Sequence, residues 1–303
     1  MDEMKKVLVS SVTDNLCEKN KIQERIDEDD NLKKILLKLS RTDKTISNSY
    51  SNILSYLNDK KSCVDCHSFF LCPKGERKGF NYRLVYSPFS DSLELSVAYC
   101  PKYSAIKAVL SNIIYSDIDP FSTYVTFMEV KKAKNLSSSD SPFVSAVATE
   151  AQLIDDFDCL GKYYVDSTSN SSYLLRLLAF YYAKSQKKVA IIQAERTFVG
   201  LESSDSISKE INQTSFSRAL ESDVLFIIDI GAEFKTSAFR DQVLIPMLIS
   251  RNSLNKKTYF CSSFSINELV SIYAKKDISI KAKLFALFQA VTEEKNISDY
   301  PFF

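Results

Sequence analysis

The sequence predicts an α/β protein in two parts: a mainly helical N-terminal module with a cysteine cluster, and a C-terminal domain built on a parallel sheet flanked by helices. In the first part, apolar residues recur at helical spacing, and four of the seven cysteines fall within 38 positions. In the second part, short apolar runs alternate with helical patterns, which is typical of a parallel sheet covered on both faces. We expect domains at residues 1–105 and 143–303, joined by a helix and linker at 106–142.

Composition excludes several classes of protein. The 303 residues carry 39 Lys and Arg against 38 Asp and Glu, so no overall charge draws the chain to nucleic acid or membranes. The first residues, MDEMKKVLV, lack the apolar core of a secretory signal, and the most apolar helical run, at 174–183, is short and contains Arg176. Cysteines without an export signal indicate thiols or metal ligands. We therefore expect a cytoplasmic protein that does not span a membrane.

Helical spacing marks the first sixty residues. Apolar residues at 32, 35, 36 and 39 follow an acidic pair at 29–30, and those at 50, 53, 54 and 57 repeat the spacing. Alternating apolar residues predict strands at 82–86 and 93–99, and a helix is predicted at 104–115. The run KKAKNLSSSDSP at 131–142 is basic and then serine-rich, which predicts a linker or exposed loop.

The C-terminal half alternates between the two patterns. It predicts strands at 162–165, 188–193, 224–229 and 258–262, and helices at 172–184, 207–220, 237–251, 266–274 and 280–291. The run at 224–229 is apolar on both faces, as in a central strand, and ends in Asp229. A tight turn that includes Glu233 follows it. In nucleotide-handling α/β domains, a carboxylate at this place holds Mg²⁺ beside the phosphates.

The cysteine cluster predicts a structural zinc site. Cys63-x2-Cys66 presents two thiolates to one ion, Cys72 follows six residues later, and Cys100 ends the second predicted strand. His67, the single histidine of the chain, is an alternative ligand. The rival interpretation is a set of unrelated buried thiols, because free cysteine packs as a small apolar side chain. A bound zinc ion would contribute folding energy to this module and no chemistry.

The loop after the first strand of the C-terminal domain lacks the features of a phosphate-binding loop. Such a loop needs glycines that free its backbone amides and a lysine that neutralises the phosphates. Residues 166–172 read DSTSNSS. Ser171 or Ser172 can cap the following helix, but Asp166 opposes an anion there. Tight binding of ATP and Mg²⁺ is therefore not expected at Asp166, Ser171, Ser172, Asp229 and Glu233, which would form a vestigial nucleotide site.

The order of several short motifs resembles the DnaI-type replicative helicase loaders, the DnaC/DnaI group of the AAA+ class. In the N-terminal module the resemblance rests on Cys63-x2-Cys66, on KGFN at 78–81, and on SLEL at 92–95 followed by Cys100-Pro101. In the C-terminal domain it rests on DIGAE at 229–233, FRD at 239–241 and Arg251, preceded by SDID at 116–119. The resemblance implies an AAA+-like fold for the C-terminal domain.

The departures from the family pattern concern its metal and ATP sites. The family's zinc histidine falls at Asn81, which leaves Cys63, Cys66 and Cys100 as matching ligands and either Cys72 or His67 as the fourth. The glycine- and lysine-bearing loop is gone, and Ile228 stands where the family has the first of two consecutive acids. The resemblance therefore implies a primosome component with a pseudo-ATPase domain, and not an enzyme.

The resemblance also implies partners. The family binds the hexameric replicative helicase through its zinc module, with single-stranded DNA and other primosome proteins as further partners. Arg240 and Arg251 match family positions and are candidates for contact with a neighbouring subunit or DNA, although a local ion pair explains such arginines equally well. Two alternatives stay open: a weak ATPase that uses Asp229 and Glu233, and a regulator that holds the helicase without loading it.

Overall fold

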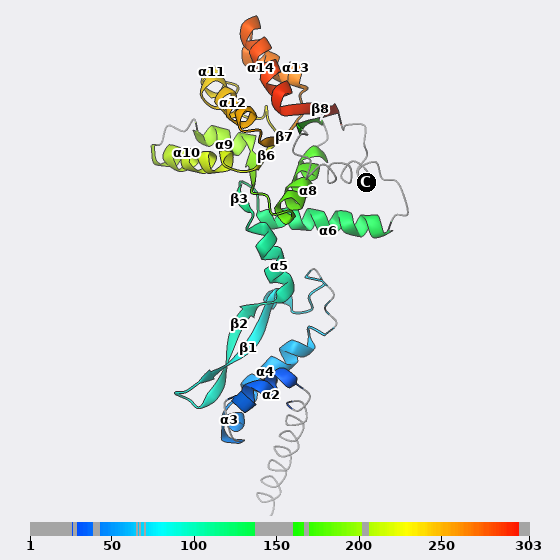
Figure 1. The fold of residues 1–303 in the computed structure, drawn as a ribbon, viewed down its shortest axis with the longest axis vertical. Helices are drawn as coiled ribbons and strands as arrows, with labels where there is room; N and C mark the ends of the chain where they lie inside the picture. The colour runs from blue at the N-terminus through cyan, green and yellow to red at the C-terminus, as the bar shows by residue number, and fades with distance from the viewer. Residues whose placement is uncertain are drawn as a thin grey trace, which may run out of the picture. The chain divides into compact units, whose positions relative to one another are not determined.

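The computed structural model describes residues 26, 29–38, 43–64, 66, 68–69, 71–136, 160–166, 170–201 and 206–296 (Figure 1). The chain divides into two compact units, Met1–Ala105 and Ile106–Phe303, which we describe separately. No helix within the described ranges has the length and apolar character needed to cross a bilayer.

The first unit packs helices against a β-hairpin. Its elements are α2 (Asp30–Lys38), α3 (Asp43–Asn48), α4 (Tyr50–Lys61), η1 (Gly75–Arg77), β1 (Phe80–Ser87) and β2 (Ser92–Tyr99). The strands pair antiparallel, with Leu84 opposite Leu95. Ile53 and Leu57 of α4 enter a core with Leu84 and the neighbouring strand residues. The predicted helical spacing and the predicted hairpin are both present; Leu39, at the end of the first predicted stripe, lies outside the described residues.

The second unit is a six-stranded sheet with helices on both faces. In chain order its elements are α5 (Pro101–Leu110, shared with the first unit), β3 (Ile113–Ser116), α6 (Pro120–Leu136), β4 (Gly161–Val165), α8 (Asn170–Lys184), β5 (Val189–Gln193), α9 (Ala194–Leu201), α10 (Ser206–Leu220), β6 (Val224–Ile228), α11 (Ser237–Phe239), η3 (Arg240–Leu244), α12 (Ile245–Ser253), β7 (Lys257–Ser262), α13 (Ile266–Ala274), α14 (Ile278–Val291) and β8 (Thr292–Asn296).

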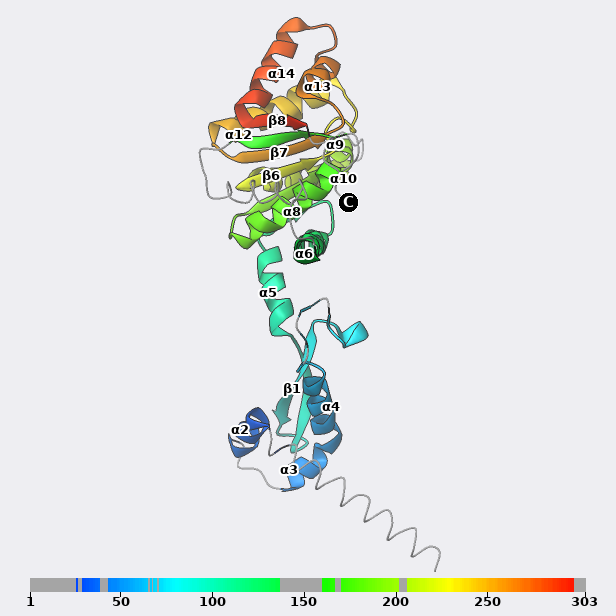
Figure 2. The same cartoon turned by 90° about the vertical axis from the view of Figure 1, so that its right-hand side faces the viewer.

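The strand order is β3-β5-β6-β7-β4-β8, and every described pair is parallel, as the sequence predicted (Figure 2). All five residues of β6 are buried, because a parallel strand inside such a sheet has helices on both faces. The core on one face includes α8 and side chains of α6, and the core on the other face includes α9, α10, α12, α13 and α14. Phe226 of β6 stacks on Tyr259 of β7 with centroids 5.1 Å apart on the α8 side.

The structure differs from the sequence-based expectation between residues 104 and 136. The predicted helix at 104–115 ends at Leu110, and β3 then joins the edge of the sheet, with Ile113 opposite Val189. Asn112, between the helix and β3, donates its side-chain amide to the carbonyl of Ala183 at the end of α8, 2.8 Å away. Residues 131–136 extend α6 instead of forming a linker, and 137–142 lie outside the described residues. The expected connecting segment therefore contributes a strand and a helix to the second unit.

Candidate functional site

The carboxyl ends of β4, β6 and β7 form the candidate site, because in open α/β sheets ligands bind outside the carboxyl ends of the strands. Asp166 directly follows β4, and its backbone amide donates to the carbonyl of Ser262 at the end of β7, 2.8 Å away. Asp229 directly follows β6, and Cys261 of β7 lies between the two acids in the sheet. Parallel pairing thus brings together residues that lie far apart in the sequence.

Asp166 caps the helix at which a phosphate would bind. Its buried carboxylate accepts a hydrogen bond from the amide of Ser171, with Oδ2 and N 2.6 Å apart. Ser171 is the second residue of α8, and Ser172 follows it in the same turn. Helix N-termini attract anions through their unpaired amides and the positive end of the helix dipole. Here the carboxylate of Asp166 occupies the position at the start of α8 where an external anion would bind.

Asp229 turns back toward Cys261. Its φ of 58° is left-handed, which aspartate tolerates better than most residues, and its amide donates to the Sγ of Cys261 at 3.4 Å. The residue is exposed overall, yet the carboxyl loses water on the side facing the sheet. This desolvation raises its pKa, opposed by the positive charge of Arg176 and reinforced by the negative charge of Asp166. Burial also raises the pKa of the Cys261 thiol to about 12, so it stays protonated.

Glu233 does not join this group. Its buried carboxylate accepts from the amide of Gly231 at 2.8 Å and from the hydroxyl of Tyr273 on α13. Gly231 has a φ of 98°, and a Cβ there would lie 2.9 Å from Leu269, so the turn requires glycine. The predicted vestigial site is therefore divided: Asp166, Ser171 and Asp229 lie around Cys261, whereas Glu233 anchors the turn to α13.

Arg240 and Arg251 are both buried and hydrogen-bonded within the second unit, so contact of either residue with a subunit or DNA stays a prediction. Arg240 donates through Nε and a terminal nitrogen to Asp241, each at 2.7 Å, and to the carbonyl of Tyr273 at 3.1 Å. Arg251 donates to the hydroxyl of Thr258 and to the carbonyls of Leu220, Ser222, Asp223 and Lys257.

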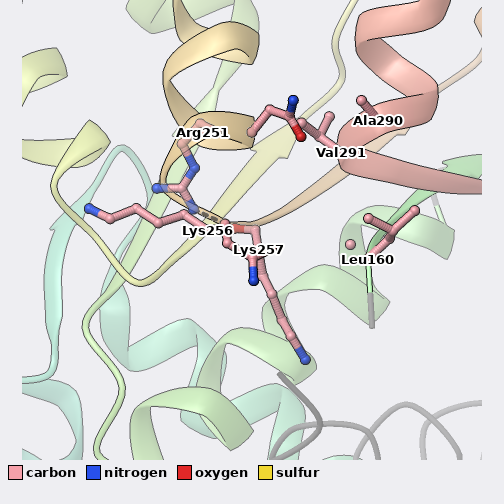
Figure 3. Close-up of a pocket in the computed structure, with 9 residues that line it drawn as sticks. Leu160, Arg251, Lys256, Lys257, Ala290 and Val291 are labelled. Carbon is pink, nitrogen blue, oxygen red and sulfur yellow. Dashed lines mark hydrogen bonds between the residues drawn. The ribbon is translucent and has the colours of Figure 1, made fainter. Parts of the chain in front are cut away.

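Arg251 lines a small hollow at the amino-terminal ends of the strands, opposite the edge that carries Asp166 and Asp229 (Figure 3). Its volume of about 20 Å³ has room for a water molecule and no substrate. In Figure 3 the guanidinium of Arg251 points toward the backbone at Lys257, whose carbonyl accepts a hydrogen bond from it. Lys256 donates to the carbonyl of Glu221, 2.8 Å away, just beyond the end of α10. These cations satisfy carbonyls just beyond α10, which is a structural role.

The four predicted zinc ligands are half-buried thiols, and two of them, Cys63 and Cys100, lie beside the start of β1. The thiol of Cys63 lies 3.7 Å from Oδ1 of Asn81 on β1, and the amide of Cys100 donates to the carbonyl of Gly79 at 2.8 Å. Among the described residues, no three His, Cys, Asp or Glu side chains come close enough to hold one ion. His67 lies outside the described residues. Zinc at Cys63, Cys66, Cys72 and Cys100 therefore stays a prediction.

A buried ion pair between Lys74, which follows Cys72, and Asp59 of α4 was not predicted from the sequence. Lys74 donates to Oδ2 of Asp59 at 2.7 Å and to Oδ1 of Asn81 at 2.9 Å, and both charged side chains are almost fully buried. Asp59 also accepts from Arg77 and from the backbone amide of Tyr82. Charged residues on an amphipathic helix indicate a solvated face, so only the tertiary structure reveals this contact.

No protein-family model matches the chain, and no curated protein matches it. Among solved structures, the chain is similar to DnaI at 18% identity, over 61% of this chain and 97% of that one, with a TM-score of 0.47. It is similar to a candidate primosome component from Streptococcus pyogenes serotype M3 at 16% identity, over 63% and 94%, with a TM-score of 0.47. It is also similar to the DnaC helicase loader at 16% identity, over 51% and 87%, with a TM-score of 0.41.

Proposed function

We propose that the chain is a binding protein of the helicase-loader type, which engages a hexameric replicative helicase without hydrolysing ATP. One observation carries the ATP part of the proposal: the carboxylate of Asp166 accepts from the amide of Ser171 at the start of α8. A triphosphate would have to displace this carboxylate or lie beside it. Two anions at one helix terminus repel each other, and no lysine in the loop at 166–172 offsets the repulsion.

The other acids of the site support the same proposal. Mg²⁺ needs several oxygen ligands in near-octahedral geometry. Asp229 itself has a left-handed φ and is preceded by Ile228 in place of a second acid. Glu233 is committed to Gly231 and Tyr273. Asp166, the other carboxylate near Asp229, accepts a hydrogen bond from the start of α8. With Ile228 in place of a second acid and both other carboxylates engaged within the fold, the arrangement disfavours the weak-ATPase alternative.

The partner part of the proposal rests on the order of motifs in the sequence. The cysteine positions, the KGFN turn and the SLEL strand lie in one folded unit, and the DIGAE turn lies at the end of the central strand β6 of the other. The first unit is the proposed helicase-binding part.

The test measures ATP binding and helicase capture on the same full-length chain. We expect no saturable ATP binding with Mg²⁺ up to ~1 mM, which corresponds to about 4 kcal/mol of binding free energy. We also expect capture of the hexameric helicase that is equal with and without ATP. Helicase-dependent saturable ATP hydrolysis would overturn the ATP part, and failure to capture the helicase would overturn the partner part.

Two further measurements sharpen the test. Asp166→Ala removes the carboxylate from the helix terminus, so the variant should bind inorganic phosphate or ATP measurably better than the wild type, whereas Ser172→Ala should not. A ring-loading assay on single-stranded DNA separates a loader from a regulator, because a regulator would capture the helicase and leave the DNA unloaded. Equal anion binding by both variants would show that Asp166 does not block the site.

A further inference from the structure

The apolar face of the β1–β2 hairpin continues beyond the core of the first unit. Paired residues of an antiparallel hairpin share a face, and so do residues two apart in a strand. Leu84 and Leu95 lie on this face and pack into the core with α4. At the other end of the same face, Phe80, Val97 and Tyr99 are 37%, 60% and 43% exposed.

Three aromatic rings are already ordered at this uncovered end. Phe80 and Tyr99 are cross-strand partners with centroids 5.3 Å apart, and Tyr103 of α5 lies 5.4 Å from Tyr99 and 6.1 Å from Phe80. Phe69 stacks beneath Tyr103 at 5.1 Å and is buried. Gly79, with a φ of 88°, leaves room for this stack, because a Cβ would lie 3.0 Å from both rings. The rings therefore form a supported surface.

Cations surround the rings. Lys78 lies 4.6 Å from the Phe69 centroid, and the half-exposed Arg77 lies 4.6 Å from the Tyr82 centroid. Lys102, next to Tyr103, is exposed and donates to the carbonyl of Cys66. Counting Asp59 of α4, which pairs with the buried Lys74 and with Arg77, two acids (Asp59 and Glu76) stand against five basic residues in and beside the segments at 74–83 and 99–103: Lys74, Arg77, Lys78, Arg83 and Lys102. In a chain with a net charge of +1, this local excess is complementary to a polyanion.

We propose that Phe80, Tyr99 and Tyr103 form a stacking platform for single-stranded nucleic acid, with Arg77, Lys78 and Lys102 meeting its phosphates. Stacking on exposed aromatic rings beside a basic surface is the usual way in which proteins hold single strands without reading their sequence. Duplex nucleic acid is excluded as the ligand of the rings, because its bases are already stacked on one another. The cations favour a nucleic acid over an apolar protein partner. This inference does not depend on helicase binding.

The test measures fluorescence anisotropy of a labelled oligodeoxythymidylate with the full-length chain. Tyr99→Leu keeps an apolar side chain on the hairpin and loses the flat ring, so we expect affinity to fall roughly tenfold. Tyr99→Phe keeps the ring and should bind like the wild type. Phe89→Ala, at the fully exposed hairpin tip, is the matched control and should leave affinity unchanged.

A second measurement tests the phosphate contacts. For single strands, each neutralised phosphate contributes about 0.7 to the slope of log affinity against log salt. Lys102→Ala should therefore lower the slope by roughly that amount, and Lys209→Ala on α10 should not change it. Circular dichroism confirms that each variant is folded. Equal affinity for Tyr99→Leu and Tyr99→Phe would overturn the platform, as would Tyr99→Leu weakening helicase capture while oligonucleotide affinity stays unchanged.

Discussion

At the scale of single residues, the hydrogen-bonding groups of Arg251 and Glu233 are occupied by contacts within the second unit. Arg251 is 1% exposed, and its five N–H groups meet one hydroxyl and four backbone carbonyls. Burial lowers its pKa to about 10, so the guanidinium is still charged at neutral pH. Both carboxylate oxygens of Glu233 likewise accept hydrogen bonds, one from the amide of Gly231 in the turn and one from the hydroxyl of Tyr273. The motif positions suggested by the family resemblance thus stabilise the fold.

Arg251→Met should lower the free energy of unfolding by about 3 kcal/mol or more, because buried carbonyls lose their donor. Urea denaturation measures the change. Arg218→Met, on the exposed side of α10, is the matched control and should change stability by less than about 0.5 kcal/mol. An Arg251→Met variant that keeps its stability but loses DNA affinity would contradict the structural role.

Glu233 makes stability depend on pH. Burial raises its pKa, opposed by the hydrogen bond from Gly231. The native state then binds more protons than the unfolded state between the ordinary and the raised pKa, so the contribution of Glu233 falls as the pH rises through that window. Gln stays neutral, so the stability of Glu233→Gln relative to the wild type should increase from pH 5 upward. A difference that is constant with pH would contradict a raised pKa.

At the scale of elements, the edge strands depend on side-chain contacts. Asp117 follows β3 and accepts from the amide of Gln193 at 2.9 Å, from the hydroxyl of Tyr115 at 2.6 Å and from Thr197 of α9. Burial and this carboxylate raise the pKa of Tyr115 to about 12, so its hydroxyl remains a donor. On the opposite edge, Glu294 of β8 accepts from the amide of Ile266 at 2.7 Å. Each edge strand is therefore joined to a neighbouring helix by its own carboxylate: β3 to α9 by Asp117, and β8 to α13 by Glu294.

Asp117→Ala should loosen β3 and lower the free energy of unfolding by roughly 1–3 kcal/mol, because the partly buried donors of Gln193 and Thr197 lose their acceptor. Hydrogen exchange should increase at 113–116 and at the start of α9. Asp119→Ala removes a single hydrogen bond to Phe121 at the start of α6, and should cost about 1 kcal/mol without exposing β3. Equal exchange at 113–116 in both variants would show that Asp117 does not hold the strand.

At the scale of the whole molecule, two units with separate cores share one chain. The larger unit rests on a sheet buried on both faces. Among its described residues, the smaller unit has a small core and a buried ion pair between Lys74 and Asp59. Small cores often need a metal or another cross-link, so the zinc prediction bears on this unit alone.

Purified protein should contain one zinc ion per chain, and a strong chelator should unfold the first unit while the second stays folded. Metal analysis and thermal denaturation followed by circular dichroism check this, because metal that binds only the native state adds its binding free energy to stability. Cys63→Ser should reproduce the effect of the chelator. A metal-free first unit that is folded and insensitive to chelator would contradict the prediction.

The sequence by itself determined the central part of the second unit, four of its six strands and most of the helices between them. The central strands were predicted because a strand buried on both faces is a continuous apolar run, as in 224–228. That residues 166–172 lack the glycine and lysine of a phosphate-binding loop was also readable, since these residues at fixed positions are local features. The edge strands β3 and β8 were not predicted. The sequence of β8 is TEEKN, with one buried residue, and β3 is four residues long. Short or polar strands show little periodicity.

Only the tertiary structure decided what each polar side chain binds. Asp166 and Ser171 are close in sequence, but their hydrogen bond depends on how α8 follows β4. Glu233 meets Tyr273, forty residues later, and Arg251 meets carbonyls about thirty residues earlier. Periodicity encodes which positions are buried, because burial depends on the residue type and its spacing. The partner of a buried polar group comes from a distant segment, and its identity follows only once the elements have packed.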